Sequence, residues 1–302
     1  NMHCPLCLSK NICITEEINA STLQRLYERL SIEVSFTTPV FQYLICQKCL
    51  LGFFYPPISG DGEFYERLQS YSWYYMTDKY EYSVAERYLP HQGKVLEIGA
   101  GKGAFSKYCK GASYTGLEFS HAAVEKARQR GVHLIEETVE KHAQKYPGAY
   151  DAVASFQVLE HVEQPLHFLN AAANCLTEKG VLIIAVPSDD SFVGHAKNAA
   201  LNAPPHHLTR WKDQTLLSVA DLLDLEVLSI EHEPVASIHR RWAASVEWNR
   251  LIERLFRIES GLFNDGIRDR VITKAASVLA RVFQLQPRDN IGHTVIAIYR
   301  RL

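Results

Sequence analysis

The stretch VLEIGAGKGAF, residues 95–105, decides the fold of this chain. A short apolar run reaches an acid and leads directly into glycines at positions 99, 101 and 103. Glycine permits positive backbone φ and lets a ligand approach the main-chain N–H groups at the start of a helix. The pattern therefore predicts a strand that runs into a ligand-binding loop, with a plain tight turn as the alternative.

The spacing of the glycines and the nearby acids narrows the class of ligand. The dinucleotide fingerprint is G-x-G-x-x-G, whereas here only one residue separates the second glycine from the third. Glu97, two residues before the first glycine, would repel a pyrophosphate and attract a cation. Glu118 falls at the end of the next predicted strand, where a carboxylate can accept hydrogen bonds from both hydroxyls of an adenosine ribose. We therefore expect a cationic ligand that carries a ribose.

From residue 94 onward, strand-like and helix-like runs alternate, which is typical of a parallel sheet flanked by helices. The strand-like runs are KVLEIGA, SYTGLEF, VHLIEET, AYDAVASF and GVLIIAVP. Two later strands are predicted at residues 227–235 and 293–301, with a long helical pattern between them. The sequence thus predicts an α/β fold with a helical insertion before the last strand.

Together with LEHV, residues 159–162, these features resemble the class I S-adenosylmethionine-dependent methyltransferases of the small-molecule type. The resemblance covers roughly residues 64–187 and implies a Rossmann-like seven-stranded sheet with helices on both faces. It assigns the binding of S-adenosylmethionine to Glu97, Gly99, Ala100, Gly101, Gly103, Glu118, Phe119, Thr138, Val139, Ser155, Phe156 and Gln157. Many relatives have an Asp where this chain has Thr138, so only the backbone contact from Val139 is expected there.

The first segment contains two C-x-x-C pairs, formed by Cys4 with Cys7 and by Cys46 with Cys49. Four thiolates in this arrangement suit tetrahedral Zn²⁺, with unligated thiols as the alternative. Because four protein ligands leave no open position for water, the ion is expected to be structural. We therefore predict a zinc-ribbon-like module over residues 1–60 and a methyltransferase domain over residues 61–302.

Two helical segments of the predicted methyltransferase domain are candidates for covering the site. Residues 64–89 are rich in aromatic side chains, and relatives place such a leading segment over the cofactor, so Tyr74 is expected near the cofactor and Tyr75 near the acceptor. Core packing is the alternative explanation of these side chains. The insertion at about residues 236–290 could cover the substrate cleft or form a homodimer interface.

The loop NAPPHHLTRW, residues 202–211, supplies the candidate groups for the methyl acceptor. Imidazoles titrate near neutrality, so His206 and His207 are predicted general bases, with His161 of LEHV as the third candidate. Arg210 could pair with a phosphate or carboxylate of the acceptor, and Trp211 lies beside it in sequence. Alternatively, the histidines cap or pack under the next helix, and Arg210 bridges a surface acid.

Composition excludes some partners. The 302 residues contain 32 Lys and Arg against 34 Asp and Glu, so the basic excess that nucleic-acid binding needs is missing. No run approaches 18 apolar residues and no secretory signal precedes CPLC, so a cytoplasmic protein is expected. We predict methyl transfer to a polar small molecule such as a sugar, a nucleotide-linked sugar or a glycan-related metabolite, with an oxygen acceptor favoured. The alternatives are an RNA methyltransferase and a non-catalytic methyltransferase-like binding protein.

Overall fold

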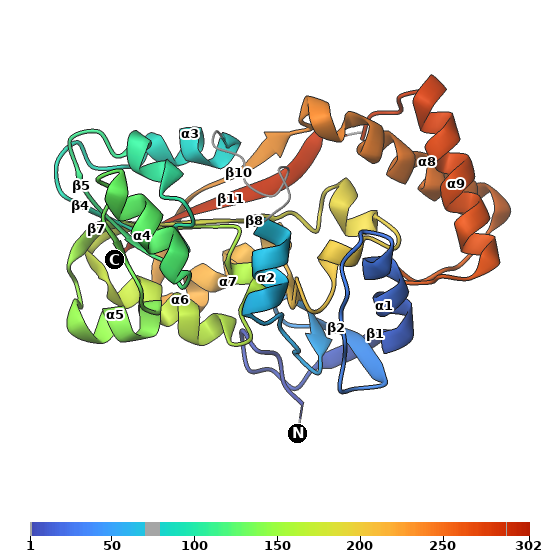
Figure 1. The fold of residues 1–302 in the computed structure, drawn as a ribbon, viewed down its shortest axis with the longest axis horizontal. Coiled ribbons are helices and arrows are strands. Elements are labelled where there is room, and N and C mark those ends of the chain that lie inside the picture. Colours follow the sequence, from blue (N-terminus) through green and yellow to red (C-terminus); the bar gives the residue numbers. More distant parts are fainter. Residues whose placement is uncertain (1, 70–78, 288) are drawn as a thin grey trace.

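A computed structural model describes residues 2–69, 79–287 and 289–302 of the chain, and its central element is a seven-stranded sheet (Figure 1). The strand order is β10-β11-β8-β7-β4-β5-β6. The strands are β4 (Lys94–Ile98), β5 (Ser113–Leu117), β6 (Leu134–Ile135), β7 (Tyr150–Phe156), β8 (Leu176–Pro187), β10 (Leu225–Pro234) and β11 (Ile291–Arg301). Neighbouring strands from β6 to β8 are parallel, and β11 is antiparallel to both β8 and β10. The predicted seven-stranded sheet is therefore confirmed.

The strand order reverses between β4 and β7. The chain adds β5 and β6 on one side of β4 and then crosses to the other side to form β7 and β8. Ile98, the last residue of β4, pairs with Leu117 of β5 and with Ser155 of β7, so the three strands end side by side. Open α/β sheets bind ligands outside the carboxyl ends of the strands at such a reversal. The fold thus places the glycine loop at the expected site.

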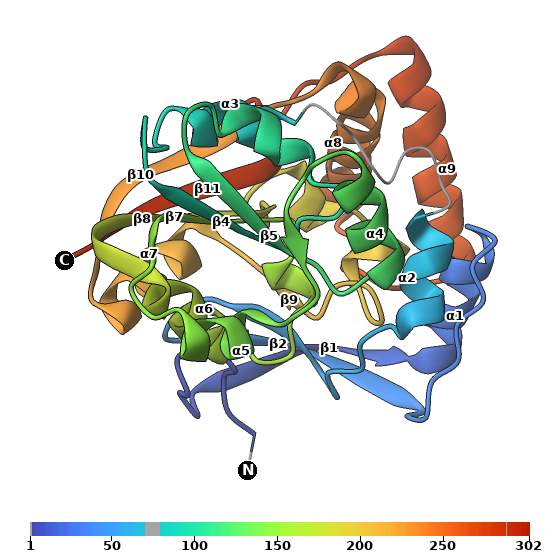
Figure 2. The ribbon, with the colours of Figure 1, turned by 60° about the vertical axis from the view of Figure 1, so that its left-hand side comes forward.

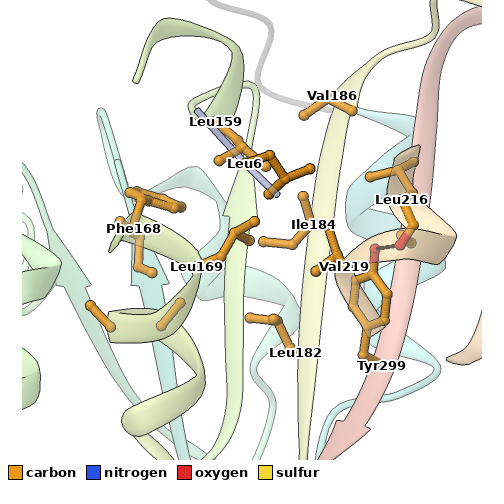
Figure 3. Packing of buried hydrophobic residues seen from close by; sticks show 14 of the residues in the cluster. Leu6, Leu159, Phe168, Leu169, Leu182, Ile184, Val186, Leu216, Val219 and Tyr299 are labelled. Atoms are coloured by element: carbon orange, nitrogen blue, oxygen red, sulfur yellow. Dashed lines mark hydrogen bonds between the residues drawn. The ribbon is translucent and has the colours of Figure 1, made fainter. Parts of the chain in front are cut away.

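Helices cover both faces of the sheet, as Figure 1 shows with α3 on one side and α5, α6 and α7 on the other. These helices are α3 (Tyr80–Glu86), α4 (His121–Gln129), α5 (Val139–Lys145), α6 (Pro165–Asn174) and α7 (Asp213–Leu223). Successive strand residues point to opposite faces, so Ile183 packs in the core under α3 whereas Ile184 packs with Leu169 and Val219 (Figure 3). Both isoleucines are buried, which explains the continuous apolar run GVLIIAVP.

The amino-terminal segment forms a second, antiparallel sheet with the strand order β1-β2-β3-β9. Its elements are β1 (Ile12–Asn19), α1 (Ala20–Glu28), β2 (Val40–Cys46), β3 (Gly52–Tyr55) and, from much later in the chain, β9 (Thr209–Arg210). Leu6 of this segment packs with Leu159 and Ile184 in the core of the large sheet (Figure 3). The small sheet and the large sheet thus share one core, and the division at residue 60 stays a prediction.

The predicted lid over residues 64–89 contains the end of α2 (Gly62–Gln69) and all of α3. Tyr74 and Tyr75 lie outside the described residues. Short 3-10 segments connect the other elements: η1 (Ala104–Tyr108), η2 (Leu159–His161), η3 (Phe192–His195), η4 (Ala200–Asn202) and η5 (Ser237–His239).

The helical insertion before the last strand is confirmed as α8 (Arg240–Phe256) and α9 (Ile267–Val282), which pack against each other. The loop between them lies against α1 in both ribbon views (Figures 1 and 2). The carboxylate of Glu16 accepts hydrogen bonds from the main-chain nitrogens of Leu262 and Phe263, at 2.7 and 3.0 Å. Asp265 forms an ion pair with Arg25 of α1, at 2.9 Å. The insertion is therefore fastened to the amino-terminal segment.

Candidate active site

The glycine loop after β4 has a conformation that requires glycine. Gly99, Gly101 and Gly103 have φ values of 74°, 54° and 71°, in the left-handed region that other residues rarely adopt. A Cβ atom on Gly99 would lie 2.4 Å from Cγ2 of Val158. The main-chain nitrogens of Gly99 and Ala100 both donate to the carbonyl of Leu117, at 2.9 Å, which ties the loop to β5. The loop is therefore fixed next to the end of that strand.

Glu118 directly follows β5, and its carboxylate organises this corner of the site. Its Oε2 accepts the main-chain N–H of Gly101 at 2.7 Å, and its Oε1 accepts those of Phe119 and Ser120 at 2.9 Å. A carboxylate offers about four acceptor positions, so one more hydroxyl can bind after these three bonds. The ring of Phe119 is 69% exposed and leaves a flat apolar surface beside the carboxylate. This corner suits a ribose with an attached aromatic base.

Glu97 is 2% exposed at the end of β4 and accepts a hydrogen bond from the hydroxyl of Tyr114. Burial raises the pKa of Glu97 to about 8, although the bond from Tyr114 and the charge of Lys79 act in the opposite direction. A bound cation would favour the ionised form and lower this pKa. The sequence did not predict Tyr114 as a site residue. Tyr114 lies on β5, four residues before Glu118, so the two side chains point to the same face of the sheet.

The end of β7 forms the other wall. Ser155 is 1% exposed, and its hydroxyl has no hydrogen-bond partner among the described residues. Phe156 packs in the core, with its ring centroid 5.0 Å from that of Tyr82 and 4.7 Å from that of Phe105. Gln157 has a φ of 57°, and its side-chain amide lies 3.3 Å from the hydroxyl of Thr294. Ser155 and Gln157 thus remain candidates for ligand contacts, whereas the ring of Phe156 serves the core.

Thr138 and Val139, the predicted adenine neighbours, begin α5. Thr138 is the N-cap residue, and its hydroxyl accepts the main-chain N–H of Lys141 at 3.2 Å. The side chain of Val139 is buried in the core. A contact between these residues and an adenine stays a prediction.

The three predicted bases lie together. The ring centroids of His161, His206 and His207 are 4.4–4.9 Å apart in pairs. Nδ1 of His161 lies 2.6 Å from the carbonyl oxygen of His206, and Nδ1 of His206 lies 2.9 Å from that of Leu201. Burial lowers the pKa of His161 to about 4 and the pKa values of His206 and His207 well below the usual value. All three imidazoles are therefore neutral at neutral pH and weak as free bases.

Glu160 is a site residue that the sequence reasoning did not single out, although it belongs to LEHV. It is 1% exposed, and its Oε1 lies 3.7 Å from Nε2 of His161 and 4.0 Å from Nε2 of His207. Its Oε2 has no hydrogen-bond partner among the residues that the structure describes. Burial raises the pKa of Glu160 to about 8. The only sequence signal was its position between the strand end and His161.

Arg210 and Trp211, predicted to bind the acceptor, are buried. The guanidinium of Arg210 donates to Asp189 at 2.7 Å and to the carbonyl of Gly194 at 2.9 Å, and it lies 5.3 Å from the ring centroid of Tyr43. Trp211 is 0% exposed, and its indole N–H donates to Thr209. These contacts fasten Arg210 to the segment after β8 and to Tyr43 of the small sheet, and neither side chain keeps a surface for an acceptor in this conformation.

The four predicted metal ligands also converge. Sγ of Cys4 lies 3.6 Å from that of Cys49, Sγ of Cys7 lies 3.5 Å from that of Cys46, and all four atoms lie within 4.8 Å of one another. The four cysteines form no disulfide. A tetrahedral zinc site with Zn–S bonds of about 2.3 Å has sulfur–sulfur distances of about 3.8 Å. The four cysteines therefore form a cluster whose spacing fits a tetrahedral ion.

Comparison with known proteins shows the family of the chain. Residues 68–230 match the family described as a methyltransferase domain. The ubiquinone biosynthesis O-methyltransferases of Yersinia pestis (strain Pestoides F) and Yersinia pseudotuberculosis (serotype O:1b) are each 28% identical over 183 residues, which span 53% of this chain and 73% of the relative.

Two solved structures are among those similar to this chain. One is an S-adenosylmethionine-dependent methyltransferase from Archaeoglobus fulgidus, with a TM-score of 0.49 and 16% identity over 73% of this chain and 94% of that chain. Another is a geranyl diphosphate methyltransferase in complex with S-adenosylmethionine, with a TM-score of 0.48 and 14% identity over 80% and 92%. Among the described residues, no helix is both long and apolar enough to cross a membrane.

Proposed function

The chain belongs to the methyltransferase domain family and is an S-adenosylmethionine-dependent methyltransferase, and we propose that it methylates an oxygen atom of a polar small molecule. The acceptor class that we propose is a sugar, a nucleotide-linked sugar or a glycan-related metabolite. The Yersinia relatives are named O-methyltransferases, which supports an oxygen acceptor. The observation that carries the proposal is that Glu160 and three histidines lie together beside the carboxyl end of β7, next to the predicted donor site.

On the donor side, Glu97 faces the cationic part of S-adenosylmethionine, and Glu118 accepts a hydrogen bond from one ribose hydroxyl. The exposed ring of Phe119 lies against the adenine. Ser155 and Gln157 border the methionine and the methyl group. The buried position of Glu97 supports this arrangement, because a carboxylate in a dry site gains much from a cationic partner. Tyr74 and Tyr75 belong to the proposed lid, and both lie outside the described residues.

On the acceptor side, His206 or His207, with His161, assists the transfer. Methyl transfer from a sulfonium is an in-line displacement, in which alignment of the two reactants can lower the barrier by about 7–11 kcal/mol. Neutral imidazoles accept hydrogen bonds from hydroxyl groups, and so they can orient an acceptor oxygen toward the methyl group. Arg210 acts indirectly in this proposal, because it holds the loop that carries the histidines.

The charge distribution argues against RNA as the acceptor. Residues 1–57 contain four Lys or Arg (Lys10, Arg25, Arg29 and Lys48) and four Glu (Glu16, Glu17, Glu28 and Glu33), so the segment that would grip a nucleic acid is neutral. The glycine loop and both acids of the donor site are present, which argues against a protein that has lost cofactor binding.

We further propose that the four-cysteine cluster holds a structural Zn²⁺. Its sulfurs are buried or half-buried in the core that the small sheet shares with the large one. A homodimer through α8 and α9 is also proposed, because these helices and their ends expose large apolar side chains. Leu255, Phe256, Ile267 and Val282 are 69–80% exposed.

The test of the proposed function is transfer of a labelled methyl group from S-adenosylmethionine to separate acceptor panels. We expect label in sugar or nucleotide-sugar hydroxyls, detected as methyl ethers by mass spectrometry. Label in RNA alone would support the nucleic-acid alternative. Binding of the donor with no transfer to any panel would support a non-catalytic protein.

A further inference from the structure

Three histidines form a second group of candidate metal ligands, separate from the cysteine cluster. Each of His161, His206 and His207 offers one ring nitrogen within 4.8 Å of the others. Glu160 and His161 belong to η2 after β7, whereas His206 and His207 belong to the loop between η4 and β9. The tertiary fold therefore assembles the group from two segments about 45 residues apart, as the pair His161 and His206 shows.

The hydrogen bonds of the imidazoles prepare them as ligands. With Nδ1 of His161 donating to the carbonyl of His206, the neutral ring carries its lone pair on Nε2. The bond from Nδ1 of His206 to the carbonyl of Leu201 fixes the same tautomer in that ring. Metal-bound histidines characteristically donate their other ring N–H to a carbonyl or carboxylate in this way.

Glu160 is a second, independent indication of a metal site. It is 1% exposed, and its Oε2 has no partner among the described residues, so one oxygen of a buried acid lacks the hydrogen bond that normally offsets desolvation. Its Oε1 is 3.7 and 4.0 Å from Nε2 of His161 and His207, which is too far for hydrogen bonds. Ligand atoms about 2.0–2.1 Å from a tetrahedral ion are about 3.4 Å apart, so these distances are close to those around a bound ion.

We propose that Glu160, His161, His206 and His207 bind one divalent transition-metal ion. Three imidazoles and a carboxylate suit Zn²⁺ or a neighbouring first-row ion better than Mg²⁺ or Ca²⁺, which prefer oxygen ligands. The carboxylate would supply negative charge through Oε1, the oxygen that lies near the imidazoles. The cysteine cluster would hold its own ion, so the chain would bind two.

The ion also gives the histidines a role in methyl transfer, and this part of the inference rests on the proposed function. If an acceptor hydroxyl joined the four protein ligands as a fifth ligand, the ion would lower the pKa of that hydroxyl, which would release its proton to water. The oxygen lone pair would then form the bond to the methyl carbon, while the electrons of the carbon–sulfur bond pass to sulfur. S-adenosylhomocysteine would leave. The imidazoles would thus act through the ion instead of as free bases.

The test loads the whole chain with excess Co²⁺, removes unbound metal, and measures bound metal and the absorption spectrum. We expect two equivalents in the wild type. The cysteine site is recognised by its thiolate-to-cobalt charge-transfer band, and the histidine site by d–d bands without one. His207→Ala should lose one equivalent and keep the charge-transfer band, whereas Cys46→Ser should lose that band.

Two further variants keep the test decisive. His167→Ala changes an exposed histidine of α6 and should retain both ions. Glu160→Gln keeps the volume of the side chain and should weaken Co²⁺ binding at the histidine site by about tenfold or more, with the charge-transfer band as the check of folding. A wild type with one equivalent and only the charge-transfer band would refute the proposal. A second equivalent that persists in both His207→Ala and Glu160→Gln would refute it too.

Methyl-transfer activity is measured separately from metal binding. Binding of two ions without any methyl transfer would refute the proposed function and leave the metal site intact. Methyl transfer by His207→Ala with unchanged KM for the acceptor and unchanged kcat would refute the role of the ion in the reaction.

Discussion

The main-chain nitrogen of Gly101 donates a hydrogen bond to Oε2 of Glu118, at 2.7 Å. This bond joins the loop after β4 to the end of β5, so one side chain both shapes the glycine loop and presents an acceptor to the site. The position of a bound ribose and the conformation of the loop therefore depend on the same carboxylate.

Glu118→Ala should weaken binding of S-adenosylmethionine by about 10- to 100-fold, because a hydrogen bond to a charged group contributes about 1.5–3 kcal/mol. Titration calorimetry measures the effect. Glu136→Ala is the matched control, since Glu136 is an exposed acid just after the neighbouring strand β6 and pairs with His121. Equal affinities of the two variants would show that Glu118 does not contact the donor.

The raised pKa of Glu97, about 8, predicts that donor binding depends on pH. Below this pKa the carboxyl is protonated in the free enzyme, so the negative charge that attracts the cation is lost as pH falls. Affinity should be on the order of tenfold weaker at about pH 6 than at about pH 7.5. Calorimetry at both pH values measures this change, and Glu97→Gln should abolish most of it. A wild type whose affinity is the same at both pH values would contradict the role of Glu97.

The raised pKa of Glu97 also affects the stability of the folded protein, and this effect depends on pH in the opposite direction. The folded-state pKa of Glu97 lies above its usual value of 4.5, so the folded free enzyme holds a proton that the unfolded chain releases. The contribution of this group to stability is therefore present below about pH 4.5 and is lost as pH rises through 8. Bound donor should offset this loss, which would appear as a larger thermal shift on donor binding at pH 8 than at pH 6.

Gly99→Ala tests whether the loop conformation is required. The φ of 74° costs an alanine about 1–2 kcal/mol, and the new Cβ would also lie 2.4 Å from Val158. Gly131→Ala is the matched control, because Gly131 also has a φ of 74° but has no atom within 4 Å of the added Cβ. In urea unfolding, Gly99→Ala should be less stable than Gly131→Ala and should bind the donor poorly. Donor affinity unchanged in Gly99→Ala would argue against the loop as the binding site.

The ion pair between Asp189 and Arg210 predicts a structural role for Arg210. Asp189→Ala leaves a 6%-exposed guanidinium without its carboxylate, which typically costs about 3–5 kcal/mol. Glu63→Ala breaks the exposed pair with Arg67 and should change stability by less than about 1 kcal/mol. The free energies of unfolding of the two variants are compared. A small loss in Asp189→Ala would leave Arg210 available for an acceptor, as the sequence first suggested.

The sequence predicted the large sheet because its signals are local. The strands β4, β7 and β8 of the parallel sheet contain apolar runs bounded by loop residues. Glycine is the residue type that tolerates positive φ freely, so the positive φ at Gly99 could be expected from its residue type. The cysteine cluster was equally readable, since two C-x-x-C pairs have few other uses in a chain of this kind.

The loop of residues 202–211 shows what local patterns cannot predict. Two prolines and two histidines indicate an irregular polar loop, but pairing of Thr209 with Phe53 depends on a segment 156 residues away. That pairing buries the loop, and burial turns Arg210 and Trp211 into internal contacts and lowers the pKa values of the histidines. The importance of Glu160 follows from the same burial, and no neighbouring residue in the sequence predicts that burial.

The central claim is that the glycine loop, Glu97 and Glu118 hold S-adenosylmethionine. Titration calorimetry of the wild-type chain with S-adenosylmethionine at neutral pH, beside Glu97→Gln, tests it most directly. We predict one binding site per chain in the wild type and a large loss of affinity in Glu97→Gln. No heat and no thermal shift in the wild type, or equal affinity in both proteins, would contradict the claim.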